Sequence, residues 1–446
     1  MDVGVIDLGD VTGSTAPRPM PVPGPVLRRA GLLAMAVLVL LGLTASVRRP
    51  PAFDQPLWTV DTGSFTWGAD TLYLIDPDGR AVSAHDPATG TVRWRLALDR
   101  PVVGVTEVGA GLAAVQLGSG PAAPRPDLTV VLVDRAGRPL ARIPGEIPEA
   151  GPARPSLLVR DSSACGDDAC ATLSRIDLTT GTAAWSLPLG PRRFLPAQAC
   201  QGDTFAVLDG PAAEVRSAAT LDVTARVAWP ANDGGLLQAA ALYDDDLVTA
   251  ELVAGGIVVT AHPLRPGAAS WSLTLPQGAT PTGISAGLFT TTCAGVLCAQ
   301  VDNGTALIDR YTGKLLAVVP ASLFVVPGVA AAAPDSVGPG GILLALAGPS
   351  AGGQRNTLII FDASAGAPLA YFPDRAIVPW SRAGGRAMLL REGGGRSGFT
   401  ALDGKGEPTQ LGSVAGTDLT CTAQADLLAC STENGQLRLF RLPTLR

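Results

Sequence analysis

Residues 82–94 read VSAHDPATGTVRW, and residues 173–185 read LSRIDLTTGTAAW. Both segments share an Asp, a Gly four positions later and a Trp eight positions later: Asp86, Gly90 and Trp94 in the first, Asp177, Gly181 and Trp185 in the second. A third segment, residues 259–271, reads VTAHPLRPGAASW and keeps the spacing of Gly267 and Trp271 behind Pro263. A repeat of this kind indicates an array of similar structural units.

Weaker copies of the same turn fill the rest of the chain. They keep an Asp with a Gly three or four positions later: Asp134 and Gly137, Asp309 and Gly313, Asp362 and Gly366, Asp403 and Gly406. Leu221 marks a further turn in LDVTARVAW, whose last residue, Trp229, is a fourth repeat tryptophan. Together, eight turns recur about every 40 to 50 residues, which is the length of a four-stranded propeller blade.

The chemistry of these residues predicts hairpin turns between short strands. An Asp side chain accepts hydrogen bonds from backbone N–H groups two or three residues on. A Gly adopts the positive φ that turns the chain back onto the next strand. The flanking segments are apolar or alternate, as in TVVLVD before Arg135, so they are strands with a buried face. The Trp falls on the outgoing strand, where it can pack against the neighbouring repeat. The sequence therefore predicts an all-β fold, a β-propeller.

The unit A-x-D-x-x-T-G-x-x-x-W resembles the repeat of the PQQ-like, quinoprotein-type β-propellers, and it matches best at residues 84–94. The resemblance covers residues 56–446 and implies a radial array of four-stranded blades, commonly eight, with each Trp docked between blades. A Pro-rich stretch at residues 16–25 and an apolar segment precede it, which is similar to a group of actinobacterial membrane-anchored propeller proteins. The strand at 436–442 has no outgoing partner, and residues 57–61, LWTVD, could supply one. The count allows seven to nine blades and favours eight.

The resemblance does not imply that this chain is an enzyme. The quinoprotein dehydrogenases are expected to have adjacent cysteines over the PQQ cofactor and acidic ligands for calcium, but the chain has no Cys-Cys pair. Propellers that serve as scaffolds in envelope assembly lack the cofactor. We therefore expect a protein without cofactor or metal that is not an enzyme, with a PQQ-dependent quinoprotein dehydrogenase as the alternative.

The N-terminal region predicts a membrane anchor. Residues 30–47 form an uncharged apolar run that would span roughly 27 Å as a helix, close to the thickness of a bilayer core. We expect a transmembrane signal anchor at 30–47, a disordered Pro-rich cytoplasmic tail at 1–29, a linker at 48–55 and the propeller at 56–446. The alternative is a cleaved signal peptide, but cleavage after Ala45 would place Leu43 where a small residue is preferred.

The seven cysteines indicate which side of the membrane holds the propeller. Six form short-range pairs around expected hairpins, for which we predict disulfides: Cys165 with Cys170, Cys293 with Cys298, Cys421 with Cys430. Cys200 is left over. Disulfides persist in oxidising compartments, so we expect residues after 47 to lie outside the cell membrane. A zinc site would need closer cysteines or more histidines than His85 and His262, which both lie beside repeat turns.

Charge and composition restrict the remaining functions. The formal net charge is −6 and there is no basic patch, so nucleic acid is not an expected partner. Because the only two histidines lie beside repeat turns, we do not expect a Ser-His-Asp enzyme. The acidic run at 244–246 is better read as a solvated surface than as a calcium site. The sequence thus predicts an extracytoplasmic binding or scaffold module, anchored in the membrane, with a protein of the envelope as partner.

Overall fold

The computed structural model describes residues 55–443 apart from a set of short segments. The segments outside the described residues are 110, 120–127, 149–156, 164–169, 198–203, 230–235, 244, 254–255, 266, 276–288, 292–295, 302–303, 321–322, 326–341, 348–356, 363–366, 374–375, 379, 382–386, 394, 403–407 and 418. The predicted tail, the predicted anchor at 30–47 and nearly all of the predicted linker also lie outside them. Within the described ranges, no helix has the length and apolar character needed to cross a membrane.

The described residues form nine sheets, and almost all neighbouring strands pair antiparallel. Sheet 1 contains β2 (Ser64–Trp67), β3 (Leu72–Ile75), β4 (Ala81–His85) and β5 (Val92–Ala97). Sheet 2 contains β6 (Val102–Val108), β7 (Leu112–Leu117), β8 (Thr129–Val133) and β9 (Pro139–Pro144). Sheet 3 contains β10 (Leu157–Asp161), β11 (Thr172–Ile176) and β12 (Ala183–Pro188). Sheet 4 contains β13 (Arg193–Pro196), β14 (Thr204–Asp209), β15 (Ala212–Ser217) and β16 (Val223–Ala228).

The second half of the chain continues the pattern. Sheet 5 contains β17 (Leu236–Leu242), β18 (Asp246–Val253), β19 (Gly256–Pro263) and β20 (Trp271–Leu275). Sheet 6 contains β21 (Phe289–Thr291), β22 (Val296–Val301), β23 (Gly304–Asp309) and β24 (Leu315–Pro320). Sheet 7 contains β25 (Leu323–Val325), β26 (Ile342–Ala347), β27 (Thr357–Asp362) and β28 (Ala367–Pro373). Sheet 8 contains β29 (Ala376–Val378), β31 (Ala387–Gly393), β32 (Arg396–Leu402) and β33 (Pro408–Ala415).

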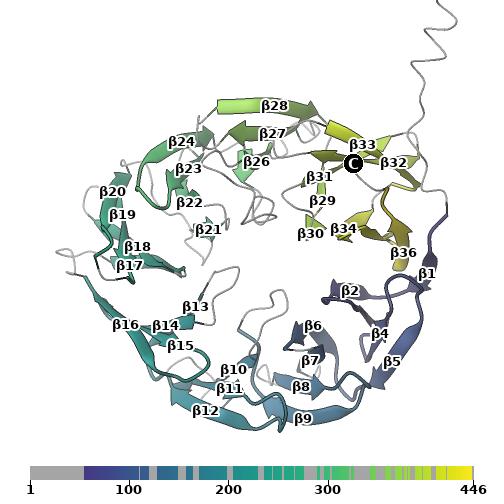
Figure 1. Ribbon diagram of the computed structural model, residues 1–446, viewed down its shortest axis with the longest axis horizontal. Coiled ribbons are helices and arrows are strands. Elements are labelled where there is room, and N and C mark those ends of the chain that lie inside the picture. The colour runs from purple at the N-terminus through teal and green to yellow at the C-terminus, as the bar shows by residue number, and fades with distance from the viewer. Residues whose placement is uncertain are drawn as a thin grey trace, which may run out of the picture. The chain divides into compact units, whose positions relative to one another are not determined.

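The last sheet joins the two ends of the propeller, so we call it the closing sheet. It contains β34 (Thr420–Gln424), β35 (Leu427–Ser431), β36 (Gln436–Arg441) and β1 (Trp58–Asp61), with β30 (Trp380–Ser381) parallel to β34. Strand β1 pairs antiparallel with β36, with Trp58 opposite Leu439. The sheets follow one another around a ring in chain order (Figure 1). The architecture is therefore all-β and of the β-propeller type.

The described residues hold nine sheets, whereas the sequence favoured eight blades. Each of the eight predicted turns falls between the last two strands of one sheet. The closing sheet has no such turn, because its fourth strand, β1, comes from the beginning of the domain rather than from a hairpin after β36. A blade count based on these turns is therefore one lower than the number of sheets in the described residues.

The turns form as the residue types predict. In sheet 1, Oδ1 of Asp86 accepts hydrogen bonds from the backbone N–H groups of Ala88 and Thr89, both at 3.0 Å. Gly90 donates its N–H to the Asp86 carbonyl at 2.8 Å and has a φ of +73°. Asp177 and Asp309 receive the same pair of backbone hydrogen bonds. The pKa of Asp86 is lowered chiefly by the hydrogen bond from Arg93, and the pKa of Asp177 chiefly by the hydrogen bond from the Thr179 hydroxyl; the backbone N–H groups lower both further.

The core lies between the sheets rather than within one of them. Tyr73 and Trp94 of sheet 1 share a buried cluster with Val115 and Val131 of sheet 2. The middle strands are covered on both faces, which explains why β8 (TVVLV) is a continuous apolar run. The outermost strands have one covered face and alternate, as β12 does.

One edge of the ring carries the first and third turns of each four-stranded sheet, and we call it the turn face. Because neighbouring strands are antiparallel, the first turn and the third turn of a sheet lie at the same edge. In sheet 1 the turn face comprises residues 68–71 and 86–91. The connections between sheets lie at the opposite edge, where Val103 stands near the start of β6.

The described cysteines confirm one predicted disulfide. Cys421 and Cys430 are directly opposite each other on β34 and β35 and form a disulfide. Cys170 is disulfide-bonded as well, and its predicted partner Cys165 lies outside the described residues. Cys298 lies on β22, whereas its predicted partner Cys293 and the unassigned Cys200 fall outside the described residues.

Candidate functional site

Tryptophans on the outermost strands contact the turn of the next sheet. A Cβ built on Gly137 of sheet 2 would lie 2.5 Å from Cβ of Trp94 in sheet 1. A Cβ on Gly313 of sheet 6 would lie 2.5 Å from Cδ2 of Trp271 in sheet 5. Glycine is needed at both turns for its positive φ and for the close approach of the indole ring. These contacts place Trp94 and Trp271 at the seams between sheets.

The indole N–H groups add a specific hydrogen bond to this packing. Trp185 donates to the carbonyl of Ala218 at 3.1 Å, and Trp271 donates to the carbonyl of Arg310 at 2.7 Å. Each acceptor is the second residue of the turn in the following sheet. The bond satisfies the indole N–H of Trp185 and of Trp271 and fixes the position of each turn relative to the preceding sheet.

Trp58 makes the same contact, although the sequence did not identify it. Its N–H donates to the carbonyl of Pro87 at 3.0 Å, and a Cβ on Gly90 would lie 2.6 Å from its Cγ. Trp58 belongs to the closing sheet and therefore has no turn before it in the chain. The sequence holds only a weak indication of this role: Trp58 lies in LWTVD, the segment at 57–61 that could pair with the last strand.

The turn assigned to Leu221 is shifted by four residues from the prediction. Ser217 takes the place of the turn Asp, and its Oγ accepts the N–H of Ala219 at 3.2 Å. Leu221 donates its N–H to the Ser217 carbonyl at 2.9 Å and has a φ of +68°, so it occupies the glycine position. The prediction was wrong because a Ser and a Leu replace the two residues that define the pattern.

This shift also changes the role of Trp229. Eight positions after Ser217 stands Ala225, which pairs with Val215 as Trp94 pairs with Ala84. Trp229 lies beyond this position and after the end of β16. It is buried and its ring centroid is 5.2 Å from that of His262 in sheet 5. Trp229 therefore contacts the next sheet, but not through the repeat geometry.

The two histidines are packed against tryptophans of preceding sheets. His85 stacks on Trp58 with ring centroids 5.7 Å apart. Its Nδ1 lies 3.1 Å from the carbonyl of Gly90 and its Nε2 lies 2.9 Å from Oγ of Ser83. Because a carbonyl can only accept, Nδ1 carries the proton and Nε2 accepts from the serine hydroxyl. Burial lowers the pKa of His85 and of His262 below the ordinary value of 6.5.

We expect this arrangement to destabilise the ring in mild acid. As the pH falls below about 6.5, both imidazoles take up a proton in the unfolded chain but resist it in the folded chain. Unfolding then binds protons, and the free energy of unfolding falls by up to about 1.4 kcal/mol per histidine per pH unit. Urea denaturation at pH 7.5 and 5.5 measures the loss, and the double variant His85→Gln, His262→Gln should lose less. An equal loss of unfolding free energy in the wild type and the double variant would show that the two histidines are not the cause.

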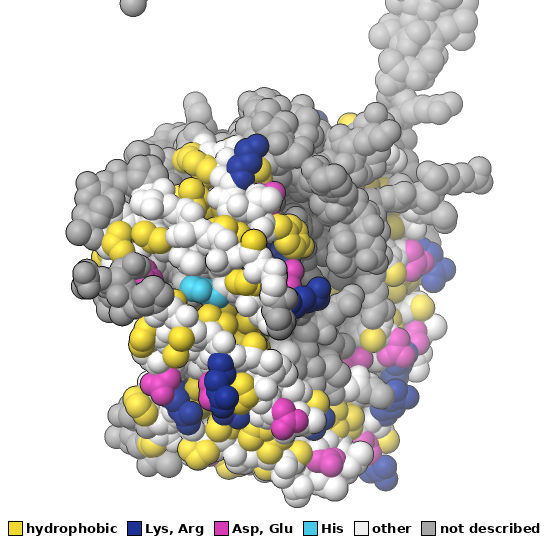
Figure 2. All heavy atoms as spheres, turned by 60° about the vertical axis from the view of Figure 1, so that its left-hand side comes forward, with side chains coloured by type: hydrophobic (Ala, Val, Ile, Leu, Met, Phe, Trp, Pro, Cys, Tyr) yellow, Lys and Arg dark blue, Asp and Glu magenta, His cyan; other side chains and the backbone are white. Residues whose placement is uncertain are grey.

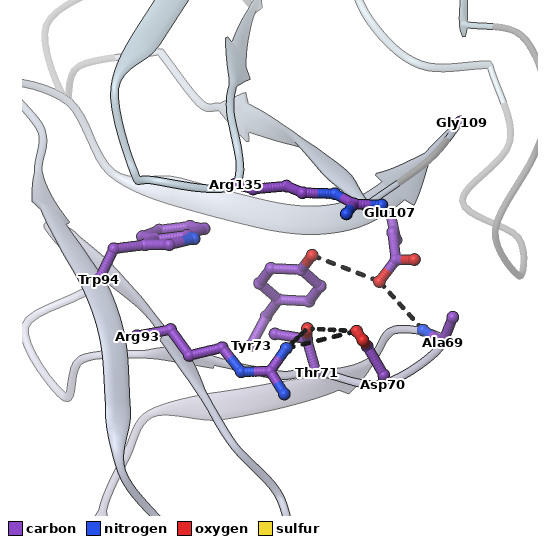
Figure 3. Close-up of a pocket in the computed structure, with 10 residues that line it drawn as sticks. Ala69, Asp70, Thr71, Tyr73, Arg93, Trp94, Glu107, Gly109 and Arg135 are labelled. Atoms are coloured by element: carbon purple, nitrogen blue, oxygen red, sulfur yellow. Dashed lines mark hydrogen bonds and ion pairs between the residues drawn. The ribbon is translucent and has the colours of Figure 1, made fainter.

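A polar cavity of about 260 Å³ lies at the turn face, in the seam between sheets 1 and 2. We call it the seam cavity. The residues that line it come from one turn of sheet 1, from two turns of sheet 2 and from strands β3, β5 and β6 (Figure 3): Ala69, Asp70, Thr71, Tyr73, Arg93, Trp94, Glu107, Gly109, Gly111 and Arg135.

Glu107 is the most deeply buried charged group of the seam cavity. Its side chain belongs to a residue that is 4% exposed, near the end of β6. Oε2 accepts the backbone N–H of Ala69 at 3.0 Å and the hydroxyl of Tyr73 at 3.3 Å (Figure 3). A Cβ on Gly68 would lie 2.0 Å from the same oxygen, so a larger residue there would displace the Glu107 carboxylate. Burial and the neighbouring Glu107 raise the pKa of Tyr73, which keeps its hydroxyl a donor.

Asp70 and Arg93 form the outer part of the seam cavity. Arg93 donates from one nitrogen to Oγ1 of Thr71 at 2.9 Å and to Asp70 at 3.4 Å, and from the other to Asp86 at 3.1 Å. The hydrogen bond from Thr71 and the guanidinium of Arg93 lower the pKa of Asp70. Arg93 is thus held by two carboxylates and a hydroxyl.

The seam between sheets 5 and 6 holds a different set of charged residues from the seam between sheets 1 and 2. Arg310, in the turn of sheet 6, forms an ion pair with Asp245 of sheet 5 at 3.0 Å and lies 4.6 Å from the ring centre of Tyr243. The acidic run at 244–246 was expected to be solvated. Asp245 instead links two sheets, and desolvation raises the pKa of Asp246. Among the described residues no group of three His, Cys, Asp or Glu could hold a metal ion.

The surface over sheets 4 to 6 carries mixed charge. Figure 2 shows basic and acidic side chains interspersed among apolar ones on this side of the molecule. Glu214, for example, pairs with both Arg216 and Arg226.

No protein-family model matches this chain, and no curated protein is similar to it. Several solved structures are similar at low identity. BamB from Moraxella catarrhalis gives a TM-score of 0.41 and 13% identity, covering 87% of this chain and 99% of that one. The WD40 domain of SCAP from fission yeast gives 0.40 and 10%, covering 87% and 98%. Apo AztD from Citrobacter koseri gives 0.38 and 13%, covering 77% and 97%. Similarity this distant says nothing of function, and the resemblance to PQQ-like propellers stays a prediction.

Proposed function

We propose that this chain is a membrane-anchored, extracytoplasmic β-propeller that acts as a binding or scaffold module at the cell envelope. The apolar run at 30–47 supports the anchor. The disulfide between Cys421 and Cys430 supports an oxidising compartment for the propeller. The partner that we propose is a protein of the envelope.

The observation that carries a binding role is the arrangement of the seams. Reactive side chains contact the neighbouring sheet: His85 stacks on Trp58 of the closing sheet, and Asp245 forms an ion pair with Arg310 of sheet 6. These seams make a rigid support, and the seam cavity is a polar concave site on its turn face. Binding residues are commonly found on loops that a rigid scaffold positions. The turn face is therefore the surface that we propose for partner recognition.

Site-specific photo-cross-linking in intact cells tests this proposal. Tyr311 lies in a turn of sheet 6 on the turn face and is 61% exposed, while Val103 lies at the opposite edge and is 58% exposed. The matched exposure makes the two positions a fair comparison. A photoreactive amino acid at Tyr311 should give a discrete cross-linked product, whereas the same amino acid at Val103 should give none. Products of equal yield at both positions, or at neither, would contradict a partner on the turn face.

A further inference from the structure

We propose that the seam between sheets 4 and 5 receives the indole ring of a tryptophan that a partner protein presents on its surface. This seam lies between β16 and the turn that follows β19, on the left of Figure 1. The role rests on the proposed function, because that turn belongs to the turn face, and it specifies the chemistry of the partner. The other seams of the ring show what this one lacks.

In four other seams, the glycine of the third turn lies directly against a side chain of the preceding sheet. A Cβ built on the glycine would lie no more than 2.6 Å from that side chain: Gly90 from Trp58, Gly137 from Trp94, Gly181 from Ala141 and Gly313 from Trp271. All four glycines are buried or half-buried. In a fifth seam, the turn at 217–221 accepts the hydrogen bond from Trp185. These seams are therefore closed by contact between an outermost strand and the next turn.

The seam between sheets 4 and 5 has neither kind of contact, and we call it the open seam. Ala225 of β16 occupies the position of the seam tryptophan, because it pairs with Val215 and the register shifts directly after that pair. Trp94 has the same pairing and the same shift. A Cβ on Gly267 meets no heavy atom within 4 Å, and Gly267 is exposed. Space that an indole occupies in three other seams is thus open here.

The open seam also keeps the hydrogen-bond acceptor that an indole uses elsewhere. The indole N–H groups of Trp58, Trp185 and Trp271 each donate to the carbonyl of the second residue of the following turn. Leu264 is the second residue of the turn in sheet 5, and its carbonyl accepts no hydrogen bond from the described residues. Open space beside such a carbonyl favours a planar aromatic group that carries one N–H donor.

No tryptophan of this chain is left to fill the open seam. Trp229 packs on His262 with ring centroids 5.2 Å apart, and it does not come within 4 Å of a Cβ on Gly267. The other tryptophans belong to other seams or to the closing sheet, or bond to it: Trp58, Trp67, Trp94, Trp185, Trp271 and Trp380. No tryptophan precedes Trp58 in the sequence. The indole therefore comes from a different protein rather than from this chain or a second copy of it.

Placing the missing tryptophan within the chain tests whether the open seam fits an indole. Ala225→Trp should raise the melting temperature of the full-length protein in detergent by about 2 °C or more, because the ring buries apolar surface without displacing a neighbour. Ala141→Trp is the matched control at the same repeat position. Gly181 lies against Ala141, so the ring would overpack that seam and lower the melting temperature. An unchanged or lower melting temperature in Ala225→Trp would overturn the proposal.

Titration of the wild-type protein with N-acetyl-L-tryptophanamide, a mimic of a tryptophan residue, tests the ligand class. Ligand-observed NMR measures the affinity, with protein-free detergent as the blank. The probe should bind about tenfold more tightly than N-acetyl-L-leucinamide, which has no aromatic ring. It should bind several-fold more tightly than its 1-methylindole derivative, which has no N–H to donate to Leu264. No binding of the tryptophan probe, or equal binding of either comparison probe, would overturn the proposal.

The same titration of two tryptophan variants locates the binding. Ala225→Trp fills the open seam, so it should lower the affinity for N-acetyl-L-tryptophanamide by at least about tenfold. Ala228→Trp adds a tryptophan at an exposed position of the same strand and should bind as the wild type does. Unchanged binding in Ala225→Trp would overturn the proposal. A missing Tyr311 cross-link would instead contradict the envelope partner and leave these affinities as stated, so the two failures are distinguishable.

Discussion

Replacing Trp94 by alanine is expected to lower the free energy of unfolding by about 3–5 kcal/mol, as for other large buried aromatic side chains. The indole is 8% exposed, packs on Gly137 of the next sheet and lies 6.0 Å from the ring of Tyr73. Its removal leaves a cavity in the seam that two rigid sheets cannot close. Urea denaturation of the purified full-length protein measures the change.

Val92→Ala is the matched control, because Val92 lies on the same strand and is 53% exposed. Its cost should stay within about 0.5 kcal/mol. Trp185→Ala should resemble Trp94→Ala, since Trp185 also stacks on a neighbour, Phe205 of sheet 4, at 5.7 Å. If both Trp variants unfold like the control, the tryptophans do not hold the sheets together.

Gly313→Ala should destabilise the ring more than Gly267→Ala, although both glycines occupy the same position of consecutive repeats. The φ angles are similar, +69° and +82°, so both variants bear the cost of an alanine in the left-handed region, about 1–2 kcal/mol. At Gly313 the new methyl group would also lie 2.5 Å from Trp271. At Gly267 it meets nothing within 4 Å. Overpacking should add about 1–3 kcal/mol at Gly313.

A double-mutant cycle separates the contact from the backbone effect. In the Trp271→Ala background the clash is absent, so Gly313→Ala should cost no more than Gly267→Ala does in the wild type. The coupling energy between positions 271 and 313 would then measure the packing of the Trp271 indole on the turn at Gly313. If Gly313→Ala and Gly267→Ala lower the free energy of unfolding equally in the wild-type protein, Trp271 does not pack closely on Gly313.

The turns of the ring could be predicted because their causes are local. An Asp that binds the N–H groups two and three positions on, followed by a Gly with positive φ, leaves a signature within five residues, as at Asp86 and Gly90. The signature failed at Ser217, where a serine makes a similar hydrogen bond and Leu221 adopts the positive φ. The seam tryptophans were visible because their spacing from the turn is fixed.

The seam cavity could not be predicted in this way, because its contacts join different sheets. Tyr73 and Glu107 are 34 residues apart and lie on strands that read as apolar. A single Glu in such a strand carries no periodic signal, and its partner becomes evident only when two sheets are packed together. Trp58 could not be predicted for the same reason, because its strand pairs with the other end of the domain.

The proposed envelope partner requires the ring to lie outside the cytoplasm, and a pair of topology reporters tests this location most directly. A reporter that is active only outside the cytoplasm should be active when fused after Arg446, and one that is active only in the cytoplasm should be silent there. Fusion of the same reporters after Arg29 should give the reverse pattern. Full activity of the cytoplasmic reporter after Arg446 would contradict an extracytoplasmic propeller and, with it, the envelope partner.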